Sequence, residues 1–128
     1  MLYQNLLMGS KPYHIAIGGM NAFELHRHPE IEFLYCLEGS CDIVVNRRAC
    51  HLTAGSLAFI GSMQPHEILK SEACRTLVIE VGPVLLGEYF EPLAKLNFPH
   101  PLLPHDAHAE LHALFRETAA LTEASLPF

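Results

Sequence analysis

The positions of hydrophobic and polar residues predict a β-rich region from Tyr13 to Glu80. Short apolar runs rich in Val, Ile, Phe, Tyr and Thr alternate there with turn residues such as Gly39-Ser40 and Ser71-Glu72, and no helical repeat lies between them. Many short strands of this kind are typical of a sandwich or a small closed barrel, and an eight-stranded jelly roll suits the pattern. Strands are expected near residues 13–18, 22–28, 31–38, 41–46, 48–52, 56–60, 66–70 and 74–81.

The pattern becomes helical after Gly82-Pro83. Residues 84–96 predict a short helix, which Gly87 weakens and which Pro92 must kink or end. The next eight residues, 97–104, hold three prolines and are expected to form a connector.

A stronger helix is expected to begin at the cap residue Asp106 and to run to about Glu123. Its apolar stripe must be buried on the barrel, on a partner subunit or on a further domain. We therefore expect one domain, with a barrel over residues 1–82 and a helical tail over residues 83–128 that packs on the barrel and dimerises. The stripe consists of Leu111, Leu114, Phe115, Thr118 and Leu121, and its hydrated rim is expected to hold His105, His108 and His112.

The composition limits the classes of function. Of the 128 residues, 50% are apolar and 17% are charged, which permits one packed domain and excludes disorder of the whole chain. The net charge is −6 and the eight Lys and Arg residues are scattered, which argues against direct binding of nucleic acid. No secretory signal or membrane helix is evident, so the cytoplasm is the expected compartment. Cysteines of cytoplasmic proteins are usually reduced. We therefore expect free, buried thiols at four positions within apolar runs, Cys36, Cys41, Cys50 and Cys74.

The segment 26–32, HRHPEIE, carries the candidate chemistry. Residues two apart on a strand share a face and lie about 6.5 Å apart, so His26 and His28 can converge on one ion. A bend after them lets Glu32 add an oxygen ligand, and His66 follows a Pro turn between two expected strands. Two further residues on the inward parity are candidate ligand-binding residues, Glu24 and Cys36.

These residues have the spacing of two motifs of the cupin superfamily, which the chain resembles. His26-x-His28-x-x-x-Glu32, followed by six residues and a glycine, matches the first motif, H-x-H-x(3,4)-E-x(6)-G. Gly55 and His66 match the glycine and histidine of the second, G-x(5)-P-x-G-x(2)-H-x(3)-N. The resemblance implies a mainly β fold, the double-stranded β-helix or cupin jelly-roll barrel, followed here by C-terminal α-helices. It also implies a metal set of His26, His28, Glu32 and His66. Other positions depart from the pattern. Met20 stands where the full first motif begins with Gly, and Gly61, Met63 and Lys70 replace the Pro, Gly and Asn of the second motif.

Among cupins, the chain is most similar to the N-terminal effector-binding domains of AraC-type transcription regulators. Residues 28–39, HPEIEFLYCLEG, resemble a run common in those domains, and residues 52–57 and 64–67 resemble their later hairpin. The resemblance implies a domain that binds a small-molecule effector, such as a sugar, and forms a homodimer through its C-terminal helices. The helix-turn-helix units of that family are not in this chain, so we expect a fragment that reaches DNA only through a downstream domain.

Two alternatives stay open from the residues alone. A free-standing metal-dependent cupin enzyme of the dioxygenase or isomerase type would use the same three histidines and one glutamate. Such an enzyme needs an acid or base beside its metal, and Glu24 is the sole acidic candidate. A sensor without catalytic residues is favoured, mostly because of the resemblance to the AraC-type effector-binding domains. The four residues can hold Zn, Ni, Fe or Mn, or hydrogen-bond a polar ligand directly, or remain an empty site.

Overall fold

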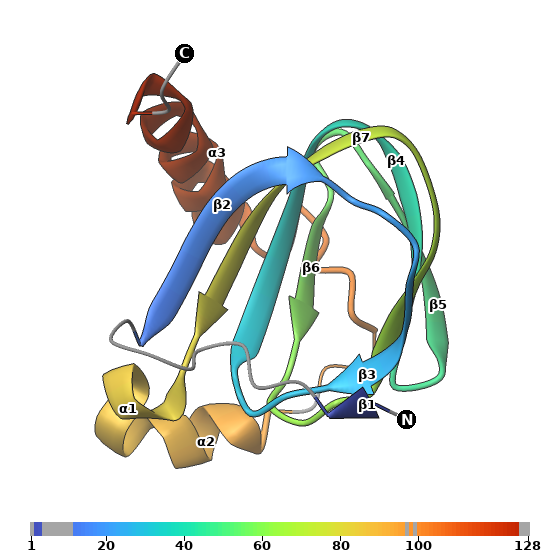
Figure 1. Cartoon of the computed structure of the whole chain (residues 1–128). Helices are drawn as coiled ribbons and strands as arrows, with labels where there is room; N and C mark the ends of the chain where they lie inside the picture. The colour runs from blue at the N-terminus through green and yellow to red at the C-terminus, as the bar shows by residue number, and fades with distance from the viewer. Residues whose placement is uncertain (1, 4–11, 97, 99, 126–128) are drawn as a thin grey trace.

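The computed structural model describes residues 2–3, 12–96, 98 and 100–125, and they form a curved β-structure followed by helices (Figure 1). This arrangement confirms the mainly β fold with C-terminal helices. The strands are β1 (Leu2–Tyr3), β2 (Tyr13–Gly19), β3 (Phe23–Arg27), β4 (Ile31–Val45), β5 (Arg48–Thr53), β6 (Leu57–Ile60) and β7 (His66–Val81). The helices are α1 (Pro83–Leu86), a 3₁₀ turn (Gly87–Tyr89), α2 (Phe90–Ala94) and α3 (Ala109–Ser125).

The long strands β4 and β7 build both layers of the fold. The first half of β4 pairs with β6 and with the second half of β7, which also pairs with β2. The second half of β4 pairs with β5 and with the first half of β7, which also pairs with β3. Each long strand therefore runs up one layer, bends, and runs down the other.

Gly39 lies at this bend. It explains why the strands continue through Gly39-Ser40 and Ser71-Glu72, where the sequence predicts that they end. The ladder between β4 and β7 continues past Gly39-Ser40 and Ser71-Glu72 with register shifts, so the four strands predicted there are two. Bulges of this kind bend a strand without ending it. Gly39 has a φ of +74°, and a Cβ atom built on it would lie 2.3 Å from the backbone oxygens of Glu72 and Ala73. Only glycine permits this approach of the two strands.

Alternate residues of the first layer face two separate cores. Leu34 and Ile60 point into the interior between the layers, where they join a cluster that also holds Cys36, Cys41, Cys50 and Cys74. Phe33 and Phe59 point the other way, into a cluster that α3 covers with Phe115. The four cysteines are buried and free, as the sequence predicts.

Helix α3 packs on the outer face of the first layer with a face that overlaps only part of the expected stripe, since Leu111 and Phe115 contact the core as predicted. His112, Phe115 and Ala119 are its buried residues, whereas Leu114 and Leu121 are 56% and 68% exposed. The prediction that His112 lies on a hydrated rim is wrong, because its Nε2 atom lies 2.7 Å from the carbonyl oxygen of Leu103 in the connector. This buried hydrogen bond lets an imidazole replace an apolar side chain in the core.

The helix boundaries also differ from the expected ones. The segment after β7 breaks at Gly87, which has a φ of +53°, whereas Pro92 lies in the first turn of α2, where its missing N–H group is not needed. Helix α3 begins at Ala109 and not beside Asp106, because residues 105–107 form a turn and the His108 N–H group lies 3.1 Å from the Pro104 carbonyl oxygen.

Among the helices that the structure describes, none combines the length and apolar character needed to cross a membrane.

Candidate functional site

The candidate site lies at the end of the two layers opposite the bend. His26 is on β3 and pairs across the sheet with His66, the first residue of β7. His28 follows β3, and Glu32 lies at the start of β4, after the chain has turned at Pro29. The structure thus brings together the four residues singled out by their spacing, and each of them is buried.

The three histidines share one hydrogen-bonding arrangement. Each Nδ1 atom faces a backbone carbonyl oxygen, at 2.8 Å for His26, 3.1 Å for His28 and 2.9 Å for His66. A carbonyl oxygen only accepts, so Nδ1 carries the proton and Nε2 keeps its lone pair. Histidines that bind metals are oriented in this way by a second partner.

The free ring nitrogens converge in the interior. One ligand atom from each of His26, His28 and His66 lies within 4.8 Å of the others. The Nε2 atoms of His28 and His66 are buried without a hydrogen-bond partner. They lie 3.1 Å and 3.9 Å from Oε1 of Glu32, so that lone pairs face a carboxylate oxygen. A cation between them would satisfy all of these atoms, and the residues therefore fit a divalent metal.

Two buried carboxylates beside this group were missed from the sequence. Glu80 lies opposite Glu32 in the ladder between β4 and β7 and is 8% exposed. Glu30 is 4% exposed, and its Oε1 atom has no hydrogen-bond partner. One ligand atom of Glu80 lies within 4.8 Å of those of His28 and Glu32. The available signal was parity, because Glu80 shares its strand face with the buried Thr76.

Burial and mutual charge shift the titration of the site. Burial lowers the pKa of His66 to about 4, so this ring is neutral near pH 7. Burial, followed by the negative charge of Glu32, raises the pKa of Glu80 to about 8. Burial alone would raise the pKa of Glu32 and lower the pKa of His28. The attraction between the two side chains outweighs burial, so the pKa of Glu32 is below its usual value and the pKa of His28 is above its usual value.

The space enclosed by these residues is small. The residues that line a cavity of about 30 Å³ include the polar His26, Glu32 and His66 and the apolar Leu34 and Ile60. This volume accommodates one or two water molecules, or an ion with a water.

Two residues predicted to bind a ligand do not join this group. The side chain of Glu24 is exposed, and this residue contributes only the backbone oxygen that faces His26 Nδ1. Cys36 is buried deeper in the interior, where its Sγ atom lies 3.4 Å from the carbonyl oxygen of Glu38. Strand parity is correct for Cys36, which faces the interior. It fails for Glu24, because β3 is shifted in register between Phe23 and His26.

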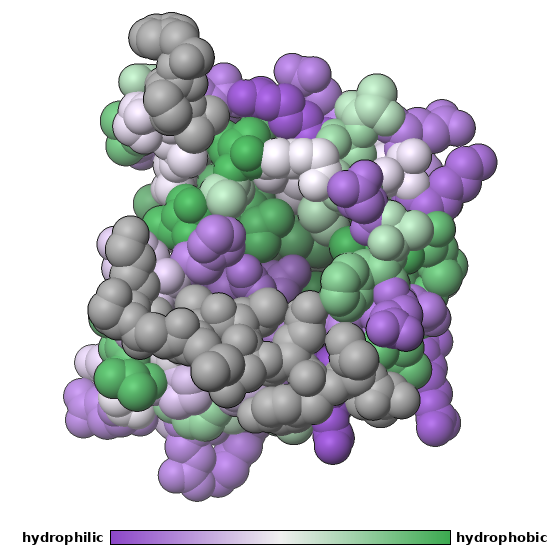
Figure 2. Space-filling view, in the orientation of Figure 1, coloured by the Kyte–Doolittle hydropathy of each residue, from purple (hydrophilic) through white to green (hydrophobic). Residues whose placement is uncertain are grey.

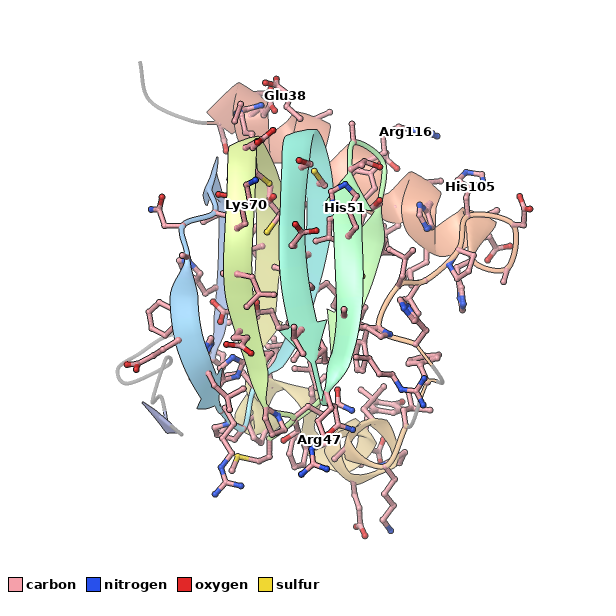
Figure 3. The ribbon with its side chains drawn as sticks, turned by 90° about the vertical axis from the view of Figure 1, so that its right-hand side faces the viewer. Glu38, Arg47, His51, Lys70, His105 and Arg116 are labelled. Carbon is pink, nitrogen blue, oxygen red and sulfur yellow. The ribbon has the colours of Figure 1, made fainter. Side chains whose placement is uncertain are left out.

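The other polar groups of the sheet lie elsewhere. His51 and Lys70 project from the outer face of β5 and β7 (Figure 3), and His51 Nδ1 lies 2.5 Å from Oδ1 of Asp42. Figure 2 shows hydrophobic patches among hydrophilic ones on one face of the molecule. Exposed apolar residues of β2 and β3 include Ile15, Phe23 and Leu25.

Replacing Glu80 by glutamine is expected to stabilise the metal-free protein at pH 8 but not at pH 5. The unfolded carboxyl group ionises above about pH 4.5, whereas the folded one keeps its proton up to about pH 8, so stability falls as the pH rises between these values. After allowance for solvent screening, the gain at pH 8 is about 1–2 kcal/mol, or roughly 4–8 °C in Tm. Thermal unfolding of both proteins at pH 5 and pH 8 measures it, and an equal difference at the two pH values would contradict the assignment.

Comparison with known proteins relates both the fold and the sequence to other families. The family model described as AraC-like ligand binding domain matches residues 13–126. Among curated proteins, none has a sequence that matches the chain significantly. A cupin protein from Bacteroides fragilis superimposes with a TM-score of 0.50 and 19% identity, over 70% of this chain and 81% of that one. A conserved protein of unknown function from Streptococcus pyogenes gives a TM-score of 0.51 and 15% identity, over 59% of this chain and 68% of that one. The fold is that of the cupins.

Proposed function

We propose, because the chain belongs to the family of AraC-like ligand binding domains, that it is the effector-binding and dimerisation domain of an AraC-type transcription regulator. The observation that supports this function best is the buried group of three inward lone pairs and one carboxylate between the layers. His26, His28, Glu32 and His66 would hold a divalent ion, Zn, Ni, Fe or Mn, and the ion would supply a Lewis-acid position for an oxygen or nitrogen donor of the effector.

A short path connects this site to helix α3. Glu32 faces the site, and its neighbour Phe33 faces outward, with its ring 5.0 Å from that of Phe115 on α3. On β6, Ile60 lines the cavity and its neighbour Phe59 contacts Phe33, with ring centroids 5.0 Å apart. A ligand that displaces β4 or β6 also moves Phe33 or Phe59, which form part of the surface under α3. Effector binding can therefore change how this helix packs.

The exposed side of α3 supports the dimer. Leu114 and Leu121 are separated by two helical turns and lie on the surface, where a second copy of the helix can cover them. DNA is bound by a separate domain of the regulator, and the protein acts in the cytoplasm.

The effector is a small polar molecule, and a sugar is one candidate. The cavity of about 30 Å³ is smaller than the 300–1,000 Å³ of typical ligand pockets, so the described conformation must open to admit it. A ligand that selects the open arrangement is what a sensor requires, since equal affinity for both arrangements would transmit no signal.

The test is a binding screen with the metal-free protein. We expect Mn²⁺, Fe²⁺, Ni²⁺ or Zn²⁺ to raise the Tm, by about 8–13 °C at 100 times the Kd, and a sugar, amino acid or aromatic acid to raise it further. Light scattering should then show a change in dimerisation with the effector, and mass spectrometry should recover the effector unchanged. Failure of every metal and every metabolite class to bind would contradict the proposal.

Glu80 favours one second candidate, a metal-dependent cupin enzyme. The sequence alone suggests only Glu24 as an acid or base beside the metal, and its side chain is exposed. The Glu80 carboxyl group lies beside Glu32 and has a pKa of about 8, so it could serve as that acid or base. Conversion of the added metabolite during the same screen would support the enzyme over the sensor.

A further inference from the structure

Glu80 lies where a second carboxylate can reach the group of histidines. It comes from the end of β7, directly across from Glu32 on β4, and its side chain is directed into the interior between the layers. One of its oxygens lies within 4.8 Å of the ligand atoms of both His28 and Glu32. His28 therefore belongs to two groups, one with His26 and His66 and one with the two glutamates.

The charges of this corner are unbalanced. Glu30, Glu32 and Glu80 are all buried, and the ion pairs of Glu30 and Glu32 within the described ranges are with histidine rings, not with lysine or arginine. The unpartnered Oε1 atom of Glu30 and Nε2 atom of His28 lie at the same corner, where His28 Nδ1 is 3.6 Å from Glu30 Oε1. Buried carboxylates without a permanently charged partner such as lysine or arginine are costly, so the corner favours a cation.

The two groups describe one ion and not two. His28 has a single lone pair to offer, because its Nδ1 proton faces the carbonyl oxygen of Glu30. An ion bound to His28 Nε2 can therefore take ligands from both groups, whereas two ions cannot share that nitrogen. A site of three imidazoles and two carboxylates takes one ligand atom from each of these five residues.

We propose that Glu80 is a fifth ligand of the metal centre and that it makes the centre prefer six-coordinate, oxygen-seeking ions such as Mn²⁺ and Fe²⁺ to tetrahedral Zn²⁺. This inference rests on the proposed function, in which His26, His28, Glu32 and His66 bind a metal. Zinc is satisfied by four ligands, whereas manganese and ferrous iron accept more and favour carboxylate oxygens. A fifth protein ligand also leaves a single position of six for a donor atom of the effector.

The test compares metal affinities of the wild-type chain and Glu80→Gln. Glutamine has nearly the same shape but a neutral, weaker oxygen donor. We expect Mn²⁺ affinity, followed by the EPR signal of free Mn²⁺, to fall 10- to 100-fold, and Zn²⁺ affinity, measured by chelator competition, to fall less than threefold. Glu72→Gln, an exposed carboxylate on the same strand, is the matched control and should change neither affinity.

The outcomes separate this inference from the proposed function. If the wild-type chain binds no metal, the proposed metal centre fails with it. If the wild type binds Mn²⁺ and Glu80→Gln binds it equally well, only the role of Glu80 is overturned. Equal losses for both metals would also overturn the preference. Glu80→Asp, which keeps the charge but draws the carboxylate back, should lose Mn²⁺ affinity as well, and full retention would point to charge rather than coordination.

Discussion

Replacing His66 by alanine is expected to abolish tight metal binding while the barrel remains folded. His66 contributes one of the three converging nitrogens, and its low pKa keeps that nitrogen free near pH 7. Loss of an outer partner of a metal ligand already costs 10–100-fold in affinity, so loss of the ligand itself should cost about 10³-fold, or about 4 kcal/mol. Calorimetric titration with Zn²⁺ and Mn²⁺ measures the effect.

His51→Ala is the matched control for this variant. His51 is a histidine on the outer face of β5 and is 58% exposed at its side chain, so its removal should leave metal affinity unchanged. Circular dichroism must show the same strand content in all three proteins. A folded His66→Ala variant that binds metal as tightly as the wild type would remove the basis for the proposed centre.

Replacing Gly39 by alanine is expected to destabilise the fold by at least about 4 kcal/mol. The positive φ of +74° alone costs an alanine about 1–2 kcal/mol. The added Cβ atom would also meet two backbone oxygens at 2.3 Å, and these can move only if β4 and β7 separate at the bend. Urea unfolding monitored by far-UV circular dichroism gives the change in the free energy of unfolding.

Gly55→Ala separates the two contributions. Gly55 has a φ of +90°, but a Cβ atom there meets nothing within 4 Å, so its replacement should cost only the conformational 1–2 kcal/mol. If Gly39→Ala costs no more than Gly55→Ala, the close approach of the two strands is not what the glycine serves.

Local sequence patterns predict much of the strand content and the main site residues. Alternation of apolar and polar residues predicts the strands, and the spacing of His26, His28 and Glu32 predicts their convergence, because strand geometry fixes which residues share a face. Whether a glycine ends a strand or bends it depends on a partner strand far along the chain. Gly39 shows this, since only the ladder with β7 carries β4 through the bend.

The missed residues also depend on distant partners. Glu80 lies near the end of an apolar strand, and its place in the site depends on Glu32, 48 positions earlier. The two residues lie opposite each other only because β4 and β7 pair. His112 is buried because the connector supplies the Leu103 oxygen, and no helical periodicity contains that information. Tertiary contacts of this kind override local preference.

The continuous course of β4 and β7 has a mechanical consequence. At one end the layers are the same two chain segments folded over, so they cannot part there. At the opposite end the layers are connected only by the loops 28–30 and 61–65 and not by continuous strands, and the proposed ligands come from both sides, Glu32 from one layer and His66 from the other. An ion bound by both layers would cross-link them at this end. With the ion bound, the layers would be held together at both ends, and without it the continuous strands would hold them at one end only.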